Sequence, residues 1–288
     1  MTRPRVRRVV PAIAVAITLT GAAACTSSSG PDTGSGGSAH HARALAALRS
    51  AERSTQRARS VRVRSTTALG SLMSTRAEGA LDWADGLTGT LTITYTGGST
   101  ADLMRRLDST SLETRYLHDA YYAKVGPAFA RKLGGKHWIK YPYDYLATLG
   151  GGSGAMMTDL MRNTTPNRSV RLLLASGDVR RTGEEQVSGV HTTHYSGTVS
   201  VSDLSGESEL RAQLTEAGVG TETVDIWVDD KNLLVKKVER AATASGTMAQ
   251  TAYYSDYGVP VAAEQPPAGD TEDFRTLLKK QGGTGSTS

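Results

Sequence analysis

Few residues of this 288-residue chain are arranged so that they could carry out covalent chemistry. Residues 151–155 read Gly-Gly-Ser-Gly-Ala, close to the G-x-S-x-G turn that presents a nucleophilic serine, but the stretch ends in alanine and no predicted strand precedes it. His191 and His194 lie three apart on a predicted strand, so their side chains point to opposite faces and cannot bind one metal ion together. The sequence therefore predicts no enzyme centre, no metal site and no cofactor.

The residue whose chemistry is supported by its surroundings is Cys25, the only cysteine in the chain. Four arginines in the first eight residues are followed by an uncharged stretch over residues 9–24, and three alanines lead directly into the cysteine. A positive start, an apolar run and small residues before a cleavage point are typical of a secretory signal peptide. The alanines and the cysteine also resemble a bacterial lipobox, in which the cysteine is acylated. We therefore predict a lipoprotein signal peptide over residues 1–24 and lipidation at Cys25.

A permanent membrane-spanning helix is the weaker interpretation of the same stretch. Its 16 residues span about 24 Å at 1.5 Å per residue, less than the hydrocarbon core of about 30 Å. Residues 26–38 then read TSSSGPDTGSGGS, a composition typical of a flexible linker. We expect residues 25–38 to be the acylated cysteine and a Gly/Ser tether, holding the following domain at the outer face of the cytoplasmic membrane.

The charges argue against a nucleic-acid partner. The chain has 33 Lys and Arg against 28 Asp and Glu, a formal net charge of +5. Four of the arginines stand in the signal region, and without them the balance is 29 against 28. A nearly neutral body binds polyphosphates poorly, so no nucleic acid is expected. The single cysteine also excludes a disulfide framework.

The hydrophobic pattern predicts one α+β domain over residues 39–262. Apolar residues recur at three-residue steps over residues 40–59, which indicates a helix, and they alternate strictly over residues 87–95, which indicates a half-buried strand. A short helix and a flexible tail are expected over residues 263–288. Further strands are expected over residues 61–64, 77–83, 113–117, 121–125, 136–141, 178–187, 190–202, 221–228, 233–242 and 247–257, and further helices over residues 128–133, 143–148, 155–162, 166–174, 207–217 and 271–280.

Such a long antiparallel sheet must bury one of its faces away from water. Leu, Ile, Val and Phe together make up only about 18% of the chain, which is lean for a globular protein. The sheet could close on itself, or it could curl around its helices and leave a cavity.

Five short segments of this domain are shared, in order, with one known family. They are residues 115–125 (RYLHDAYYAKV), 133–138 (LGGKHW), 172–179 (LLLASGDV), 189–195 (GVHTTHY) and 225–229 (DIWVD). With the lipobox they resemble the LppX/LprG-type actinobacterial lipoproteins and, more distantly, the LolA/LolB carriers, over about residues 40–260. The resemblance implies a strongly curved antiparallel sheet, an incomplete β-barrel wrapped around a few helices, whose hydrophobic interior holds acyl chains without cofactor or catalysis. It supplies no residue-level binding motif.

Candidate cavity residues come from the pattern alone. Met157, Leu160 and Met161 share one face of a predicted helix, and flexible methionines suit an adaptable lining. The glycine-rich loop over residues 150–154 could hinge this helix as a lid, although an ordinary core-packing helix explains the same pattern. The opposite wall is expected to include residues that would serve equally well as ordinary core: Leu91, Ile93, Tyr95, Leu172 and Leu173.

The sequence thus predicts a membrane-anchored extracytoplasmic lipoprotein, not an enzyme, that binds acyl chains of a lipid or glycolipid and carries or presents them. The alternative is a non-transport lipoprotein that uses the same fold as a platform for an envelope protein or a sensor. An open, apolar interior favours the first hypothesis and a solidly filled one favours the second.

Overall fold

The computed structural model describes residues 35–146, 148–149, 165–204, 206, 208–216, 218–243 and 246–283. Its contacts divide the chain into two units, Met1–Ser35 and Gly36–Ser288, and the account below concerns the second. Cys25 and the expected lid residues Met157, Leu160 and Met161 lie outside the described residues. The signal peptide, the lipidation and the lid therefore stay predictions.

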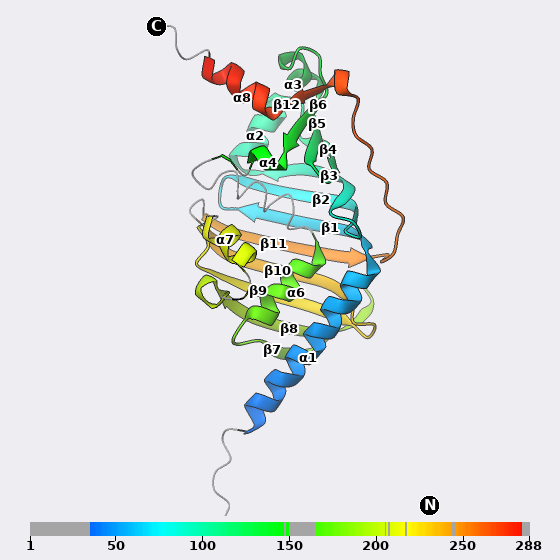
Figure 1. Ribbon diagram of the computed structural model, residues 1–288, viewed down its shortest axis with the longest axis vertical. Coiled ribbons are helices and arrows are strands. Elements are labelled where there is room, and N and C mark those ends of the chain that lie inside the picture. The colour runs from blue at the N-terminus through cyan, green and yellow to red at the C-terminus, as the bar shows by residue number, and fades with distance from the viewer. Residues whose placement is uncertain are drawn as a thin grey trace, which may run out of the picture. The chain divides into compact units, whose positions relative to one another are not determined.

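Twelve strands of the described chain form one sheet (Figure 1). The strands are β1 Ser60–Leu69, β2 Met73–Asp82, β3 Thr88–Gly97, β4 Ser111–Tyr116, β5 Ala120–Lys124, β6 Trp138–Pro142, β7 Arg180–Val187, β8 Val190–Ser200, β9 Thr221–Asp229, β10 Leu234–Thr243, β11 Gly246–Ser255 and β12 Thr271–Asp273.

The strand order shows two meanders joined at one seam. The order is β12-β6-β5-β4-β3-β2-β1-β11-β10-β9-β8-β7, so β1–β6 run outward in one direction and β11–β7 in the other. The seam is the antiparallel pair β1–β11. Neighbouring strands are antiparallel throughout, except that β12 pairs in parallel with β6. The predicted α+β class with a long, mostly antiparallel sheet is confirmed.

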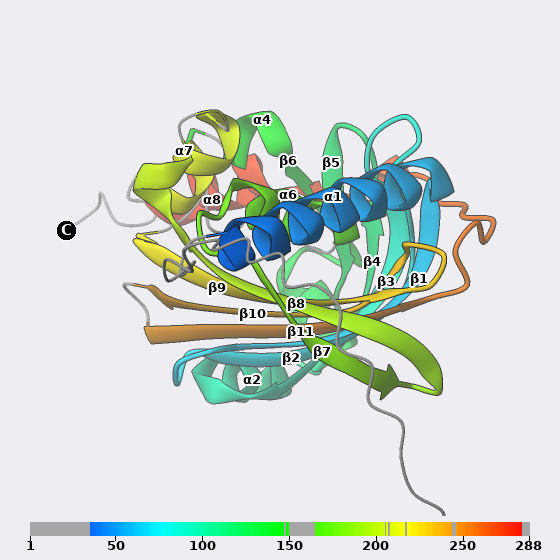
Figure 2. The same ribbon diagram turned by 90° about the horizontal axis from the view of Figure 1, so that it is seen from below.

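The helices are inserted between these strands or follow them. They are α1 Ser35–Ala58, α2 Gly98–Arg106, α3 Pro127–Lys132, α4 Tyr143–Leu146, α6 Pro166–Ala175, α7 Ser208–Glu216 and α8 Phe274–Gly283, with 3₁₀ turns at Val201–Asp203 and Ala268–Asp270. Figure 2 shows α1, α6 and α7 on the same side of strands β8–β11.

Alternation along each strand decides which residues face these helices. In β1, Val61 and Val63 are buried while Arg62 and Arg64 are exposed, as expected for a strand with one covered face. Ser65 continues the buried row, and because directly paired residues share a face, the register carries this row to both neighbouring strands. We call this side of the sheet the inner face. It contributes most of the main hydrophobic core.

The structure departs from the expected elements at three places. Helix α1 begins at Ser35, so residues 35–38, expected to belong to the tether, are helical. Helix α2 was not expected, and its sequence begins with a glycine and carries no side-chain cap. The helix expected over residues 271–280 begins only at Phe274, because residues 271–273 form β12, which pairs with β6. That pairing joins residues more than 130 positions apart, which no local pattern reveals.

Candidate functional site

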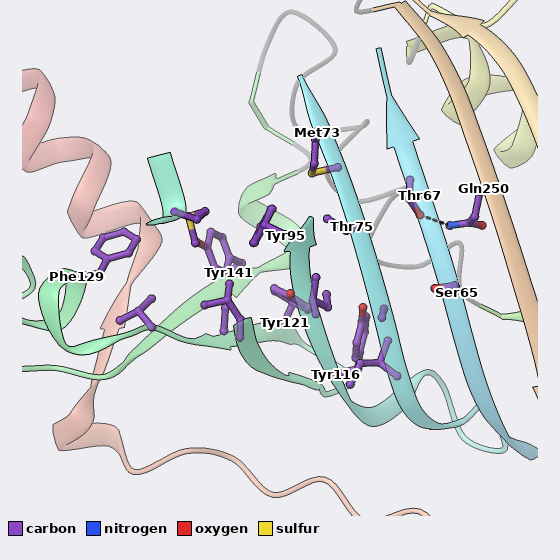
Figure 3. Close-up of a pocket in the computed structure, with 17 residues that line it drawn as sticks. Ser65, Thr67, Met73, Thr75, Tyr95, Tyr116, Tyr121, Phe129, Tyr141 and Gln250 are labelled. Carbon is purple, nitrogen blue, oxygen red and sulfur yellow. Dashed lines mark hydrogen bonds between the residues drawn. The ribbon is translucent and has the colours of Figure 1, made fainter. Parts of the chain in front are cut away.

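A cavity of about 290 Å³ opens on the inner face of the first meander (Figure 3). It touches seven neighbouring strands, from β11 through β1 to β6, and two flanking helices, α2 and α3. Its lining consists of Ser65, Thr67, Met73, Thr75, Ala77, Leu91, Ile93, Tyr95, Met104, Leu112, Tyr116, Tyr121, Ala123, Val125, Phe129, Tyr141 and Gln250.

Strand pairing brings these residues together from distant parts of the chain. Ala77 of β2 lies opposite Ile93 of β3, and Ile93 lies opposite Leu112 of β4. Two positions away along β3, Tyr95 lies opposite Thr75. Because side chains alternate between the two faces with a period of two, each strand gives the cavity every second residue.

Aromatic rings occupy the end of the cavity nearest β6. The ring centroids of Tyr116 and Tyr121 are 5.1 Å apart in an edge-to-face arrangement, and those of Tyr121 and Tyr141 are 5.8 Å apart. The ring centroid of Phe274, at the start of α8, lies 4.8 Å from that of Tyr141. Such ring pairs combine apolar contact with a preferred geometry, so they form a firm lining.

The cavity lining carries no formal charge. None of its residues is Asp, Glu, Lys, Arg or His. Burial raises the pKa of Tyr121 well above its ordinary value, and the neighbouring tyrosines raise it further. Burial likewise raises the pKa of Tyr95 and Tyr141. These hydroxyls therefore stay neutral at physiological pH, and the space is suited to an uncharged, largely apolar group.

The opposite end of the cavity, at the seam, is polar. Ser65 and Thr67 of β1 and Gln250 of β11 face it, as the right-hand side of Figure 3 shows. Gln250 Nε2 donates a hydrogen bond of 3.2 Å to Thr67 Oγ1. The lining thus changes from aromatic to polar between β6 and β11.

Beyond Gln250 the inner face carries a buried ionic cluster. Lys237 Nζ lies 3.0 Å from Glu239 Oε2, and both side chains are fully buried. Helix α6 adds Ser169, whose hydroxyl donates to Glu239 Oε1 at 2.5 Å, and Arg168, whose Nη1 lies 3.8 Å from the same oxygen. Arg168 also lies 3.7 Å from Glu222, so two positive and two negative side chains meet beneath α6.

Burial and charge oppose each other at Glu239. Burial alone would raise the pKa of this carboxyl, but the positive charges of Lys237 and Arg168 and the Ser169 hydrogen bond outweigh burial and hold the pKa below its ordinary value. At Lys237 burial is the stronger effect and lowers the pKa of the ammonium group, despite the attraction of Glu239. The cluster is therefore an ionic filling of the sheet's inner face under α6.

The candidate residues expected from the sequence divide between these two regions. Leu91, Ile93 and Tyr95 line the cavity. Leu172 and Leu173 do not, because α6 packs over β8, β9 and β10, where both leucines are fully buried in the core. They were expected in the opposite wall of the cavity, and the structure places them in the core beneath α6.

Three tyrosines of the lining were not expected from the sequence. Tyr121 and Tyr141 stand in short strands that contain tyrosine or tryptophan on both faces, so the aromatic pattern alone does not say which side is inward. Tyr116 is the last residue of β4 and the only aromatic residue in that strand. The available signal is the alternation of Arg115 and Tyr116 in β4, because the charged residue marks the outer face. The register then pairs Tyr116 with Tyr121 of β5.

Comparison with known proteins shows which family this chain belongs to. No family model matches the chain. A protein of Streptomyces coelicolor named "Putative lipoprotein SCO4650" is 52% identical to it, over 98% of this chain and 100% of that protein. The chain belongs to this lipoprotein family. A Streptomyces griseus protein described as "Uncharacterized 31.2 kDa protein in rplA-rplJ intergenic region" is 49% identical, over 85% of this chain and 84% of that protein.

Among solved structures, the lipoprotein is similar to LppX of Mycobacterium tuberculosis. The TM-score is 0.50 and the identity 18%, and the match covers 77% of this chain and 99% of LppX. At this identity the similarity concerns the fold alone. The resemblance to LppX-type lipoproteins that the sequence motifs indicated is confirmed.

Two kinds of feature are absent from the described part of the lipoprotein. Within the described ranges, no helix combines the length and the apolar character needed to cross a membrane. The same part of the chain holds no group of three or more His, Cys, Asp or Glu side chains placed to bind a metal ion.

Proposed function

We propose that this lipoprotein is anchored outside the cytoplasmic membrane through acylated Cys25 and binds an acyl chain of a lipid or glycolipid in the tyrosine-lined cavity, in order to carry or present it. The observation that carries the proposal is the uncharged cavity of about 290 Å³. Its volume lies near the lower end of the range for small-molecule sites, roughly 300–1,000 Å³. This room suits one apolar tail, and each methylene group buried there contributes about 0.8 kcal/mol.

The proposal includes a sheet that curves around the cavity as an incomplete barrel. In a flat sheet the seven strands from β11 to β6 would extend over about 29 Å, since neighbouring strands lie about 4.8 Å apart. A single cavity of this volume touches all seven. Contact with both ends of such a row is expected when the sheet bends around the space, which supports the curvature.

The change of lining along the cavity supports an amphipathic ligand. The rings of Tyr121 and Tyr141 offer apolar contact at one end, whereas Thr67 and Gln250 offer hydrogen-bonding groups at the other. A hydrocarbon tail would lie among the rings, and an ester, amide or hydroxyl group would lie near the seam.

The lipid-binding proposal is tested by what the purified protein carries. The protein is isolated from its native host without added lipid and extracted with organic solvent, and the extract is analysed by mass spectrometry. We expect an acyl lipid in a fixed ratio to protein, and uptake of a fluorescent fatty acid once the lipid is removed. Reproducible absence of lipid together with no uptake would contradict the proposal and leave the protein-binding alternative.

The membrane anchor is tested by replacing the cysteine. We expect Cys25→Ser either to release the protein from the membrane fraction or to leave its signal peptide uncleaved, because the serine hydroxyl cannot take the thioether-linked lipid. Fractionation and N-terminal mass determination measure both outcomes. Ser27→Ala is the matched control and should stay in the membrane fraction. A Cys25→Ser protein that is cleaved and still membrane-bound would contradict the anchor.

A further inference from the structure

The outward side of helix α1 is a cationic stripe. The helix buries Ala44, Leu48, Ala51 and Thr55 against the core. Its four arginines are all exposed, and at about 100° per residue they fall within an arc of about 120° on the side opposite the buried residues. We call this set the α1 stripe: Arg43, Arg49, Arg53 and Arg57.

The charges of the α1 stripe are not neutralised by the described part of the protein. Arg53 donates to Ser50 Oγ at 3.1 Å, and Arg57 donates to the backbone oxygen of Arg53 at 3.1 Å. Among the described residues, no carboxylate forms an ion pair with any of the four. The helix has one acidic residue, Glu52, which lies outside the arc of the stripe.

A surface groove continues the stripe toward α6. It has a volume of about 640 Å³, is widely open, and is lined by Arg53, Gln56, Arg57, Glu52 and Arg171 of α6. Guanidinium groups on both sides of an open groove suit phosphate groups, because their planar N–H donors pair with phosphate oxygens.

We propose that the α1 stripe and this groove form a docking surface for the anionic phospholipid headgroups of the membrane to which the protein is tethered. The position in the chain supports this occupant. Only nine residues, 26–34, separate Cys25 from the first residue of α1. A flexible linker of this length has a root-mean-square reach of roughly 17 Å. The helix itself is about 36 Å long, so much of the stripe lies within reach of a surface that holds Cys25.

The charge of the rest of the chain makes the stripe distinctive. After residue 24 the chain has 29 Lys and Arg against 28 Asp and Glu, so its overall charge does not draw it to an anionic surface. Four arginines on one exposed arc do attract it to such a surface, since each basic residue near the surface strengthens binding roughly five-fold. Docking would lay α1 along the membrane, an orientation that attachment at Cys25 alone does not impose. The inference rests on the proposed anchor at Cys25, but it does not depend on what the cavity holds.

Vesicle binding of the unlipidated chain tests the docking surface. The protein is residues 25–288 with Cys25→Ser, which keeps the whole unit Gly36–Ser288. It is sedimented with vesicles of phosphatidylglycerol and phosphatidylcholine in equal amounts, and with vesicles of phosphatidylcholine alone. We expect binding to the anionic vesicles only, weakening as salt is added. Replacing the four arginines of the stripe with glutamine should weaken this binding about 100-fold or more.

The matched control removes the same charge from other exposed positions, namely Arg64, Arg76, Arg106 and Arg131, each changed to glutamine. This control should bind within about three-fold of the parent chain. Equal losses in both variants, or equal binding to neutral and anionic vesicles, would overturn the proposal. Circular dichroism and fluorescent fatty-acid uptake are measured on both variants. Retained uptake with lost vesicle binding separates the docking surface from the cavity, so the two proposals can fail independently.

Discussion

The first meander, β1–β6, and the second, β7–β11, present the same face of one sheet to the interior, yet they fill it differently. Over the first meander the face is lined by uncharged side chains and leaves a cavity. Over the second, α6 covers it, and Lys237, Glu239 and Arg168 meet beneath the helix. The two fillings are separated by the row through Ser65 and Thr67 at the seam.

One fold can thus hold both a fixed and an open half. A buried ion pair adds little net stability, because removing two charges from water costs about as much as their attraction returns. It does require exact partners, so Arg168 and Ser169 fix where α6 lies on the sheet. A cavity lined by neutral side chains makes no such demand and tolerates different contents.

The largest expected effect on stability comes from removing one charge from the buried ionic cluster of the second meander. Glu239→Leu leaves Lys237 and Arg168 buried with Glu222 as the remaining carboxylate of the cluster. We expect the free energy of unfolding to fall by about 3–5 kcal/mol, the usual cost of leaving a buried charge uncompensated. Denaturant-induced unfolding followed by circular dichroism measures it.

The double variant Lys237→Met, Glu239→Leu is the control for this prediction. It removes one charge of each sign, so it should lose less stability than Glu239→Leu alone. If the double variant is the less stable of the two, the pair does not act as a compensated unit.

The second prediction compares the stability cost of phenylalanine at two alanines that pair with the same residue. Ser65 pairs with Ala77 toward the cavity and with Ala252 toward the ionic half. Ala252 is fully buried in packed core, so Ala252→Phe should cost about 1–3 kcal/mol through overpacking. Ala77→Phe extends into the cavity, so it should cost less than about 1 kcal/mol and prevent uptake of a fluorescent fatty acid. Thermal unfolding and dye titration measure both. Equal costs at the two positions would mean that the cavity is filled in solution.

The contrast also explains what could be predicted from the sequence. Strands joined by tight turns were predicted well, because alternation and turn residues are local signals. The cavity side of β3 follows from the same rule, since Leu91 and Ile93 alternate with threonines.

The ionic half could not be predicted in this way. In β10, Lys237 and Glu239 look like solvent-facing residues, but the strand pairing places them on the inner face, and the register shifts between Leu234 and Lys236. Their partner Arg168 stands in a helix about 70 residues earlier. The place of Leu172 and Leu173 could not be predicted for the same reason, because it depends on which strands α6 packs against.

The smallest expected effect is the response of the two halves to acid. Because Lys237 and Arg168 outweigh burial and keep the pKa of Glu239 below its ordinary value of 4.5, the folded state binds the proton less readily than the unfolded chain. The stabilising contribution of Glu239 is therefore complete above about pH 4.5 and is lost as the pH falls through the folded-state pKa. The charged or titratable groups around this carboxylate are Lys237, Arg168, Glu222 and Tyr254.

We expect Glu239→Gln to lose less unfolding free energy than the parent protein when the pH is lowered from 6 to 3.5, measured by urea unfolding at each pH. Tyr121→Phe is the control from the cavity half. Its hydroxyl is neutral throughout this range, because burial raises its pKa, so this variant should follow the parent protein's acid response. A parent-like response in Glu239→Gln would mean that folding leaves the pKa of this carboxyl unchanged. The charges of Lys237 and Arg168 would then not outweigh burial at Glu239.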